Sequence, residues 1–180
     1  MLHYLQNLFQ ALDVSSLTDA VLRVAAVFLC LTVHETCHGL AALALGDPTA
    51  KSMHRLSLNP LHHIDWLGLA LMFTVGFGWA KPVPVNPNYF RKPKQGMAVT
   101  ALAGPVSNLL LAVFFLGIGK VIYLYAPYSA GMNVFFEWCL FTVAPMSVGM
   151  GLFNLIPLPP LDGSKVLAMF LPNSVYEKLM

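Results

Sequence analysis

Three long apolar stretches constrain the fold of this chain more than any other feature. They cover residues 17–45, 96–125 and 133–153, and each is long enough for a helix to cross the roughly 30 Å hydrocarbon core of a bilayer. The composition agrees, since 57% of the residues are hydrophobic and only 10% are charged, against about 25% charged in an average soluble domain. The sequence therefore predicts an all-α polytopic membrane protein with about three transmembrane helices, rather than a soluble protein with an unusually apolar core.

The region between the first two spans predicts two further elements. The apolar run from Trp66 to Val75 is too short to cross a bilayer, which favours a re-entrant segment. The next stretch, Gly76 to Asn86, mixes β-branched residues with glycines and prolines that exclude a helix. We expect it to form a short extended β edge, on which only Val83 and Val85, set between prolines, can donate to an added strand. The alternative is a surface loop that the prolines merely stiffen.

The distribution of positive charge predicts the orientation in the membrane. The loops at 46–65 and 81–95 hold six of the ten Lys and Arg residues, whereas residues 1–20 and 127–133 hold none. Because cytoplasmic loops are enriched in Lys and Arg, the N-terminus is expected outside. We expect a multi-pass integral protein of a bacterial cell membrane, with the far ends of the first and third spans on the cytoplasmic side. The net charge is only +2, so we expect no nucleic-acid partner.

One motif inside the first span points to a specific chemistry. His34 and His38 are four residues apart, so on a helix both project from one face and could bind one metal ion. With Glu35 they form the His-Glu-x-x-His pattern of helical zinc metalloproteases, in which the glutamate takes a proton from the water on the metal. Ionisable groups inside an apolar span are costly and usually functional. The alternative is that both histidines bind buried carbonyls and Glu35 pairs with one of them.

A catalytic zinc needs a third protein ligand and an open fourth position. Asp162 is the candidate, because it lies in an apolar setting beyond the third span and on the same side as the motif. It follows a proline-broken stretch, the kind of irregular backbone that lines sites at membrane depth. The alternative is that Asp162 caps the short helix expected at 164–171. We expect one zinc ion held by His34, His38 and Asp162.

Two asparagines are candidates for stabilising an oxyanion during hydrolysis. A positioned amide N–H is a usual second donor beside a zinc ion. Asn154, eight residues before Asp162, is the first choice as a catalytic residue, and Asn108 is the second. The alternative for each is equally favoured, namely that the amide caps broken backbone within the membrane.

The order of the motifs resembles the site-2 protease family of intramembrane zinc metalloproteases over nearly the whole chain after residue 20. The matching motifs are His-Glu-x-x-His at 34–38, Gly-Asp-Pro-Thr-Ala at 46–50, Leu-Asn-Pro at 58–60, Ala-Gly-Pro-x-x-Asn at 103–108, and Asn-x-x-Pro-x-Pro-Leu-Asp-Gly at 154–163 with one extra proline, Pro159. The resemblance implies a three-helix catalytic core, zinc held by His34, His38 and Asp162, Glu35 as catalytic base, and regulated cleavage of membrane-anchored proteins.

Two departures from the family pattern concern the first loop and the end of the chain. Relatives often have Gly before the arginine of the first loop, whereas this chain has His54 before Arg55, which puts the backbone conformation of that turn in question. We expect His54 to lie at the membrane interface, and the alternative is that it is an additional metal ligand. Relatives of this size usually continue into another apolar helix. We therefore divide the chain into an amphipathic lead at 1–16, an intramembrane metalloprotease core at 17–172, and a tail at 173–180 for which truncation is an open alternative.

Together these features favour a zinc-dependent endopeptidase that cuts the transmembrane segments of membrane-anchored proteins within the lipid bilayer. One alternative is a catalytically silent, zinc-binding membrane chaperone, although Glu35 would then have little purpose. The other is a metal or proton transporter with the three candidate ligands along its path, although three spans are few for that.

Overall fold

The computed structural model describes residues 14–75, 81–127 and 129–172. This part is mostly helical, and three of its helices are long and apolar enough to cross a membrane, as predicted. They are α2(Val14–Ala44), α5(Pro93–Tyr125) and a third that combines α6(Ala130–Glu137), a π-helical turn η3(Trp138–Val143) and α7(Ala144–Asn154). The predicted lead at 1–16 lies almost wholly outside the described residues, and the tail at 173–180 lies wholly outside them.

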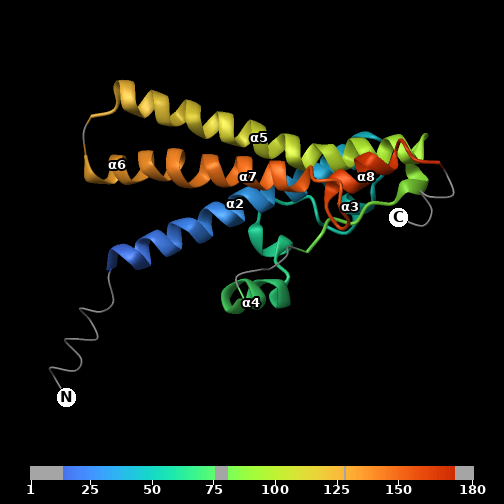
Figure 1. Cartoon of the computed structure of the whole chain (residues 1–180), viewed down its shortest axis with the longest axis horizontal. Helices are drawn as coiled ribbons and strands as arrows, with labels where there is room; N and C mark the ends of the chain where they lie inside the picture. The colour runs from blue at the N-terminus through green and yellow to red at the C-terminus, as the bar shows by residue number, and fades with distance from the viewer. Residues whose placement is uncertain (1–13, 76–80, 128, 173–180) are drawn as a thin grey trace, which may run out of the picture.

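Short elements connect the long helices. They are α3(Thr49–Ser52), the 3-10 turns η1(Pro60–His63) and η2(Pro87–Tyr89), α4(Trp66–Val75), and α8(Asp162–Ala168). Helix α4 covers the range predicted to be re-entrant and lies to one side of the long helices (Figure 1). Its first residue, Trp66, is 73% exposed. Whether α4 enters a bilayer stays a prediction.

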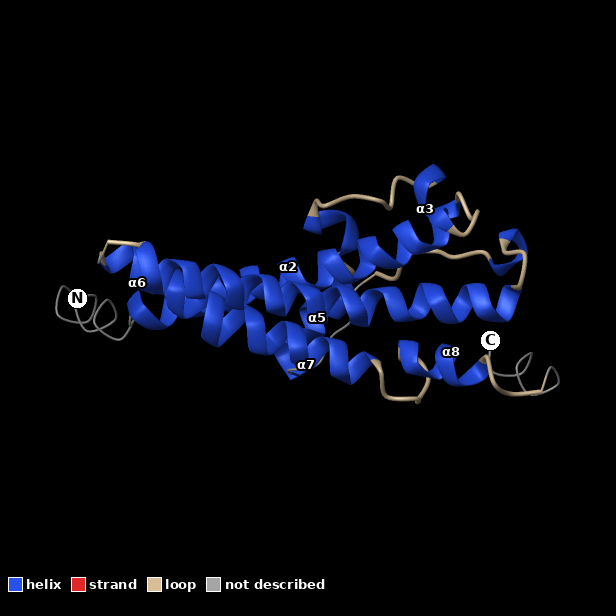
Figure 2. Cartoon of the chain, turned by 90° about the horizontal axis from the view of Figure 1, so that it is seen from above, coloured by secondary structure: helices blue, strands red, loops and turns tan. Residues whose placement is uncertain are grey.

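The predicted β edge falls partly on residues that the structure describes. Residues 76–80 are outside that part, and the described half at 81–86 is not assigned as a strand. No strand occurs elsewhere in the described chain (Figure 2). Asn86 does have an extended backbone, with φ −110° and ψ 105°, so the extended edge stays a prediction.

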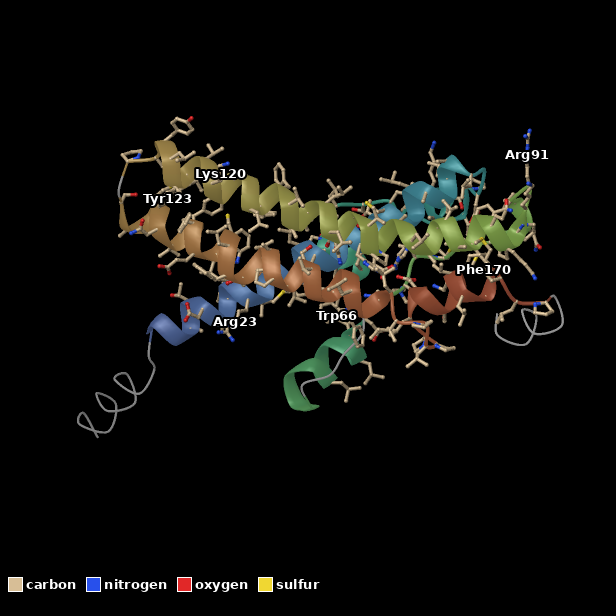
Figure 3. All side chains as sticks on the ribbon, turned by 45° about the horizontal axis from the view of Figure 1, so that its top comes forward. Arg23, Trp66, Arg91, Lys120, Tyr123 and Phe170 are labelled. Atoms are coloured by element: carbon tan, nitrogen blue, oxygen red, sulfur yellow. The ribbon has the colours of Figure 1, made fainter. Side chains whose placement is uncertain are left out.

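The three long helices bring widely separated parts of the sequence to one end of the molecule. Helix α5 contacts α2, α7 and α8. The last turns of α2 and α7 reach the N-terminal half of α5, while the turn from α5 to α6 lies at the opposite end (Figures 1 and 2). We call these two regions the site half and the far half. Figure 3 shows Arg91 at the end of the site half and Lys120 and Tyr123 near the end of the far half.

Apolar contacts hold the far half together. Its core consists of Ala26, Cys30, Phe115, Cys139 and Val143, which come from all three long helices. The indole N–H of Trp138 donates to the carbonyl of Leu22 at 2.8 Å and so fixes the third helix against α2. The π-helical turn directly precedes α7, whose second residue, Pro145, has no N–H for a regular helical hydrogen bond.

Candidate metal centre

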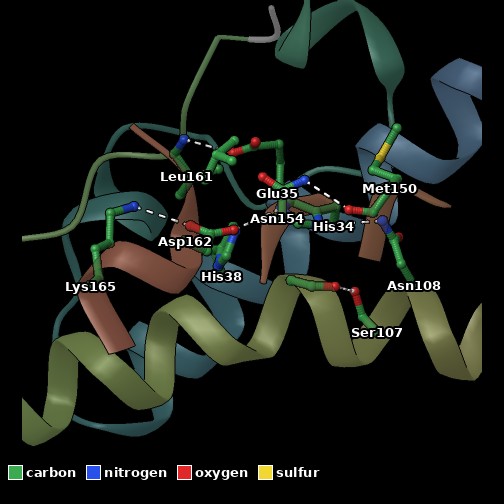
Figure 4. A network of polar contacts seen from close by, with 12 residues as sticks. His34, Glu35, His38, Ser107, Asn108, Met150, Asn154, Leu161, Asp162 and Lys165 are labelled. Atoms are coloured by element: carbon green, nitrogen blue, oxygen red, sulfur yellow. Dashed lines mark hydrogen bonds and ion pairs between the residues drawn. The ribbon is translucent and has the colours of Figure 1, made fainter. Parts of the chain in front are cut away.

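Three buried side chains that lie far apart in the sequence converge in the site half. His34 and His38 project from one face of α2, and Asp162 begins α8 (Figure 4). The distance from Asp162 Oδ2 is 3.1 Å to His34 Nε2 and 3.0 Å to His38 Nε2. One ligand atom from each of the three residues lies within 4.8 Å of the other two. The structure thus brings together the three residues that the sequence predicts as ligands.

The spacing and chemistry of this group fit a zinc ion. Tetrahedral zinc ligands lie about 2.0–2.2 Å from the metal, so two ligand atoms stand roughly 3.3–3.6 Å apart. The two observed Nε2–Oδ2 distances fall short of that range by only a few tenths of an ångström. Two imidazole nitrogens and one carboxylate oxygen are a usual donor set for zinc, and three protein ligands leave one position open.

The second nitrogen of each imidazole has its own polar neighbour. His38 Nδ1 lies 2.7 Å from the carbonyl oxygen of Thr100. Because a carbonyl can only accept, Nδ1 carries the hydrogen, which directs Nε2 toward the candidate metal position. His34 Nδ1 lies 3.3 Å from the amide nitrogen of Asn108. Both neighbours belong to α5, so this helix orients the two histidines of α2.

Gly104 allows α5 to approach the histidines this closely. A Cβ atom at this position would lie 2.5 Å from His38 Nε2 and 2.7 Å from His34 Cε1, closer than real Cβ contacts permit. A residue with a side chain would therefore displace one or both imidazoles. The glycine of the Ala-Gly-Pro motif is explained by this contact.

The carboxylate of Asp162 is directed at the metal group and at one lysine. The residue that caps α8 is Leu161, without a side-chain cap bond, so capping does not account for Asp162. Lys165 Nζ donates to Asp162 Oδ1 at 3.2 Å. Burial alone would raise the pKa of Asp162, but the adjacent imidazoles of His34 and His38 and the charge of Lys165 hold this pKa well below its usual value. The carboxylate is therefore ionised, as a metal ligand must be.

Glu35 lies beside the metal group and contacts the segment at 81–86. Its Oε2 accepts a hydrogen bond from the backbone N–H of Val83 at 3.0 Å. Glu35 also lines a cavity of about 940 Å³, together with His34, His38 and Asp162. Val83, Val85 and Asn154 also line this cavity.

Asn154 lines the cavity, but its amide is partly engaged. Its Nδ2 donates to the carbonyl of Met150, one helical turn earlier, at 3.0 Å. This bond to a carbonyl of the same helix occupies one of the two amide hydrogens. Catalysis by Asn154 stays a prediction.

The first loop holds the 81–86 segment in place. His54 has a φ of +54°, so the turn keeps the left-handed backbone that favours glycine, and its side chain is exposed. Among the described residues, it belongs to no cluster that could hold a metal. The next residue, Arg55, donates through Nη2 to the carbonyls of Lys81 and Pro82 at 2.7 and 3.2 Å. Buried Asp47 accepts from the N–H of Asn86 at 2.7 Å.

Several contacts at the site were not found from the sequence. The acceptor for His38 is the backbone carbonyl of Thr100, and the donor to Glu35 is the backbone N–H of Val83. Neither backbone group has a signal in the sequence. Gly104 does have a signal in the sequence, because glycine in a helix interior costs about 1 kcal/mol relative to alanine and therefore suggests a close contact at that position.

Comparison with known proteins supports the metal centre. No family model and no solved structure matches the chain. The chain is 40% identical over 161 residues to "Putative zinc metalloprotease YwhC" of Bacillus subtilis, a match that covers 87% of the chain and 72% of that protein. It is 30% identical over 148 residues to "Putative zinc metalloprotease Rip2" of Mycolicibacterium smegmatis, covering 79% of the chain and 54% of that protein. The chain therefore belongs to the zinc metalloprotease family of YwhC and Rip2.

Proposed function

We propose that this protein is a zinc-dependent intramembrane endopeptidase of the site-2 protease type, which hydrolyses peptide bonds in transmembrane segments of membrane-anchored proteins. The observation that carries the proposal is the position of the metal group. His34 and His38 lie within a helix long and apolar enough to cross a membrane, and Asp162 meets them just beyond the end of another. A soluble substrate would not readily reach a metal group at such a place, whereas a membrane-embedded substrate would reach it directly.

The residues of the site divide the chemistry between them. His34, His38 and Asp162 would hold the zinc, which when bound supplies Lewis-acid activation of water and of the scissile carbonyl. Glu35 accepts the proton of the attacking water and passes it to the leaving amine, so that the C–N bond breaks and an acid and an amine are formed. Asn154 has a second amide hydrogen available for the developing oxyanion.

A transmembrane substrate must open before it can be cut, because its peptide bonds are hydrogen-bonded within its own helix. We propose that residues 81–86 hold the opened substrate by strand addition. Val83 is buried, and Val85 packs against the cluster of Ala42, Phe90 and Met97. Residues two apart in an extended chain share one edge, and Val83 N–H on that edge already faces Glu35. A strand added there would run past the proposed base.

The backbone of this segment leaves few groups for pairing. The N–H groups of Lys81 and Asn86 donate to the carbonyl of His63 and to Asp47. Val83 N–H donates to Glu35. Of the described residues, none accepts a hydrogen bond from Val85 N–H in the structure, so Val85 is the position at which an added strand would first pair.

Cleavage can be tested directly with purified protein in lipid bilayers. A panel of single-span membrane proteins is incubated with it, with and without a zinc chelator, and cut positions are read by mass spectrometry. We expect cuts within the apolar segments that stop with chelator and return with zinc, and that slow at least ~10²-fold with Glu35→Gln. Cuts confined to soluble flanks would contradict the proposal. Zinc carried into the vesicle lumen without any cleavage would favour the transporter alternative.

Strand addition has its own test. A cysteine placed at Val85 should crosslink to substrate near the cut, whereas a cysteine at Asn88, in the exposed turn that follows, should not. Replacing Gly, Pro or Asn near the cut by Leu or Ala should slow cleavage, because these changes stabilise the substrate helix. An unchanged rate together with no crosslink at Val85 would refute this mode of recognition.

The proposed location is the cell membrane of a bacterium, with the metal centre toward the cytoplasmic side. The loops rich in Lys and Arg lie at the same end of the molecule as the metal centre, and such loops tend to stay in the cytoplasm. A cysteine at exposed Arg91 should react with a membrane-impermeant reagent only after the cells are opened. Labelling of intact cells at this position would reverse the orientation.

A further inference from the structure

Asn108 is a fully buried asparagine that none of the proposed catalytic steps uses. It lies on α5, one turn beyond Gly104, and its side chain faces the histidines of α2 (Figure 4). Ser147 on α7 donates to the backbone carbonyl of Asn108 at 2.7 Å. The position of this residue is thus fixed from a second helix.

The contact between Asn108 and His34 is different in kind from that between Thr100 and His38. The carbonyl of Thr100 can only accept a hydrogen bond, so it fixes the His38 ring with its hydrogen on Nδ1. Asn108 presents its Nδ2 to His34 Nδ1 at 3.3 Å, which leaves the hydrogen of a neutral His34 on Nε2, where it bonds Asp162. In that form His34 cannot offer Nε2 to a metal.

The other end of the same amide lacks a partner. Asn108 Oδ1 is buried and accepts no hydrogen bond from the residues that the structure describes. A half-turn of the carboxamide exchanges its oxygen and nitrogen, which places the oxygen about where Nδ2 now lies. An oxygen there accepts from His34 Nδ1–H and frees Nε2 for the metal. Because one end of the amide stays unpaired either way, the contact with His34 decides its orientation.

We infer that Asn108 is a positioning residue for the metal centre: in the zinc-loaded protein its carboxamide oxygen accepts from His34 Nδ1–H and holds Nε2 toward the metal. This inference rests on the proposed zinc site and adds a residue to it. It gives the asparagine of the Ala-Gly-Pro-x-x-Asn motif a role that is neither an oxyanion donor nor a cap for broken backbone. The amide serves both states of the site, since it donates to the ring without metal and accepts from the ring with metal.

Two substitutions separate this role from simple packing. Asn108→Leu has nearly the same size but no acceptor, and we expect zinc affinity to fall ~10- to 100-fold, as for other lost partners of metal-bound histidines. Asn108→Asp keeps an acceptor and should retain zinc within a few-fold of the wild type. Affinity is measured by competition with a chelator of known strength. Ser147→Ala is the matched control, because it disturbs the contact between α5 and α7 but leaves the amide intact.

A spectroscopic readout covers the case in which Asn108→Leu does not fold. In zinc-loaded protein with labelled histidines, the Nδ1 proton of His34 should resonate further downfield in Asn108→Asp than in the wild type, because a charged acceptor forms the stronger hydrogen bond. Equal shifts in these two proteins, or wild-type zinc affinity in folded Asn108→Leu, would overturn the inference while leaving the zinc site standing. Wild-type protein that binds no zinc would instead refute the proposed function.

Discussion

The site half and the far half of the molecule are built from the same three long helices but are held together differently. In the far half, small residues and aromatic rings pack on one another around Cys139 and Val143. In the site half, the buried residues include many polar ones that bond across helices: His34, His38, Thr100, Asn108, Ser147 and Asp162. Polar groups are expensive to bury unless each finds a partner. Their concentration at one end indicates that this end is built for chemistry and the other for stability.

The comparison predicts that the same kind of change has different consequences in the two halves. Removing a polar group from the site half removes a ligand, a proton acceptor or an orienting bond, and function should fail while the helices remain packed. Removing a methyl group from the far half should cost only packing. Four substitution experiments test this contrast.

The largest effects are expected where a ligand or the base is lost. Asp162→Ala should lose zinc and all turnover, because it subtracts one of three ligands. Glu35→Gln should keep zinc yet lower turnover by ~10²- to 10⁴-fold, the range for loss of a general base. Zinc content by mass spectrometry and cleavage rates on one substrate check both. If the two variants lose zinc equally, Glu35 has been assigned the wrong role.

A smaller effect is expected at Asn154, which faces the cavity without contacting the metal group. Asn154→Ala should lower kcat by ~10²- to 10³-fold and change KM little, provided its free amide hydrogen stabilises the oxyanion. Steady-state kinetics on folded protein give the answer. Turnover at the wild-type level would leave Asn154 as a cap on the carbonyl of Met150.

Gly104 in the site half and Gly117 in the far half both lie on α5, so substituting each compares the two halves within one helix. Gly104→Ala places a methyl group 2.5 Å from His38 Nε2, and displacing the ring should weaken zinc binding by ~10-fold or more. Gly117→Ala meets nothing within 4 Å and should leave zinc binding unchanged, while alanine favours the helix by about 1 kcal/mol. Competition with a chelator measures the zinc affinity of both variants. Equal zinc affinity would mean that α5 can move away from the histidines without consequence.

The smallest effect on the site is expected in the far half. Val143→Ala removes two methyl groups from a fully buried position and should lower the stability of the folded protein by ~1–3 kcal/mol, as for other large-to-small changes in a core. Zinc affinity should not change. Unfolding in detergent with and without zinc measures both quantities. Loss of zinc in this variant would show that the halves are coupled and that the contrast between them is too simple.

Much of the fold was predictable because its signals are local. The three apolar stretches predicted three helices, and the ranges at 17–45 and 96–125 differ by only a few residues from Val14–Ala44 and Pro93–Tyr125. The third span was predicted as one helix at 133–153, whereas it contains a π-helical turn before Pro145. Length and hydropathy decide that a helix exists, but they carry no information on where its hydrogen bonding shifts by one residue.

Part of the candidate site could likewise be predicted from the sequence and part could not. The spacing of His34 and His38 and the apolar setting of Asp162 predicted the three side chains that the structure brings together. The contacts that orient them could not be predicted, because Thr100 and Val83 act through backbone atoms that every residue has. The sequence makes Asn108 a candidate oxyanion donor, and only the packing of α5 on α2 shows that its amide contacts a histidine.

Anomalous diffraction would show where the metal ion lies. Crystals of zinc-loaded protein, measured on both sides of the zinc absorption edge, would show the ion as an anomalous peak. The account predicts one peak, at about 2.0–2.2 Å from His34 Nε2, His38 Nε2 and one carboxylate oxygen of Asp162. A peak at another position, or one that lacks Asp162 as a ligand, would contradict it.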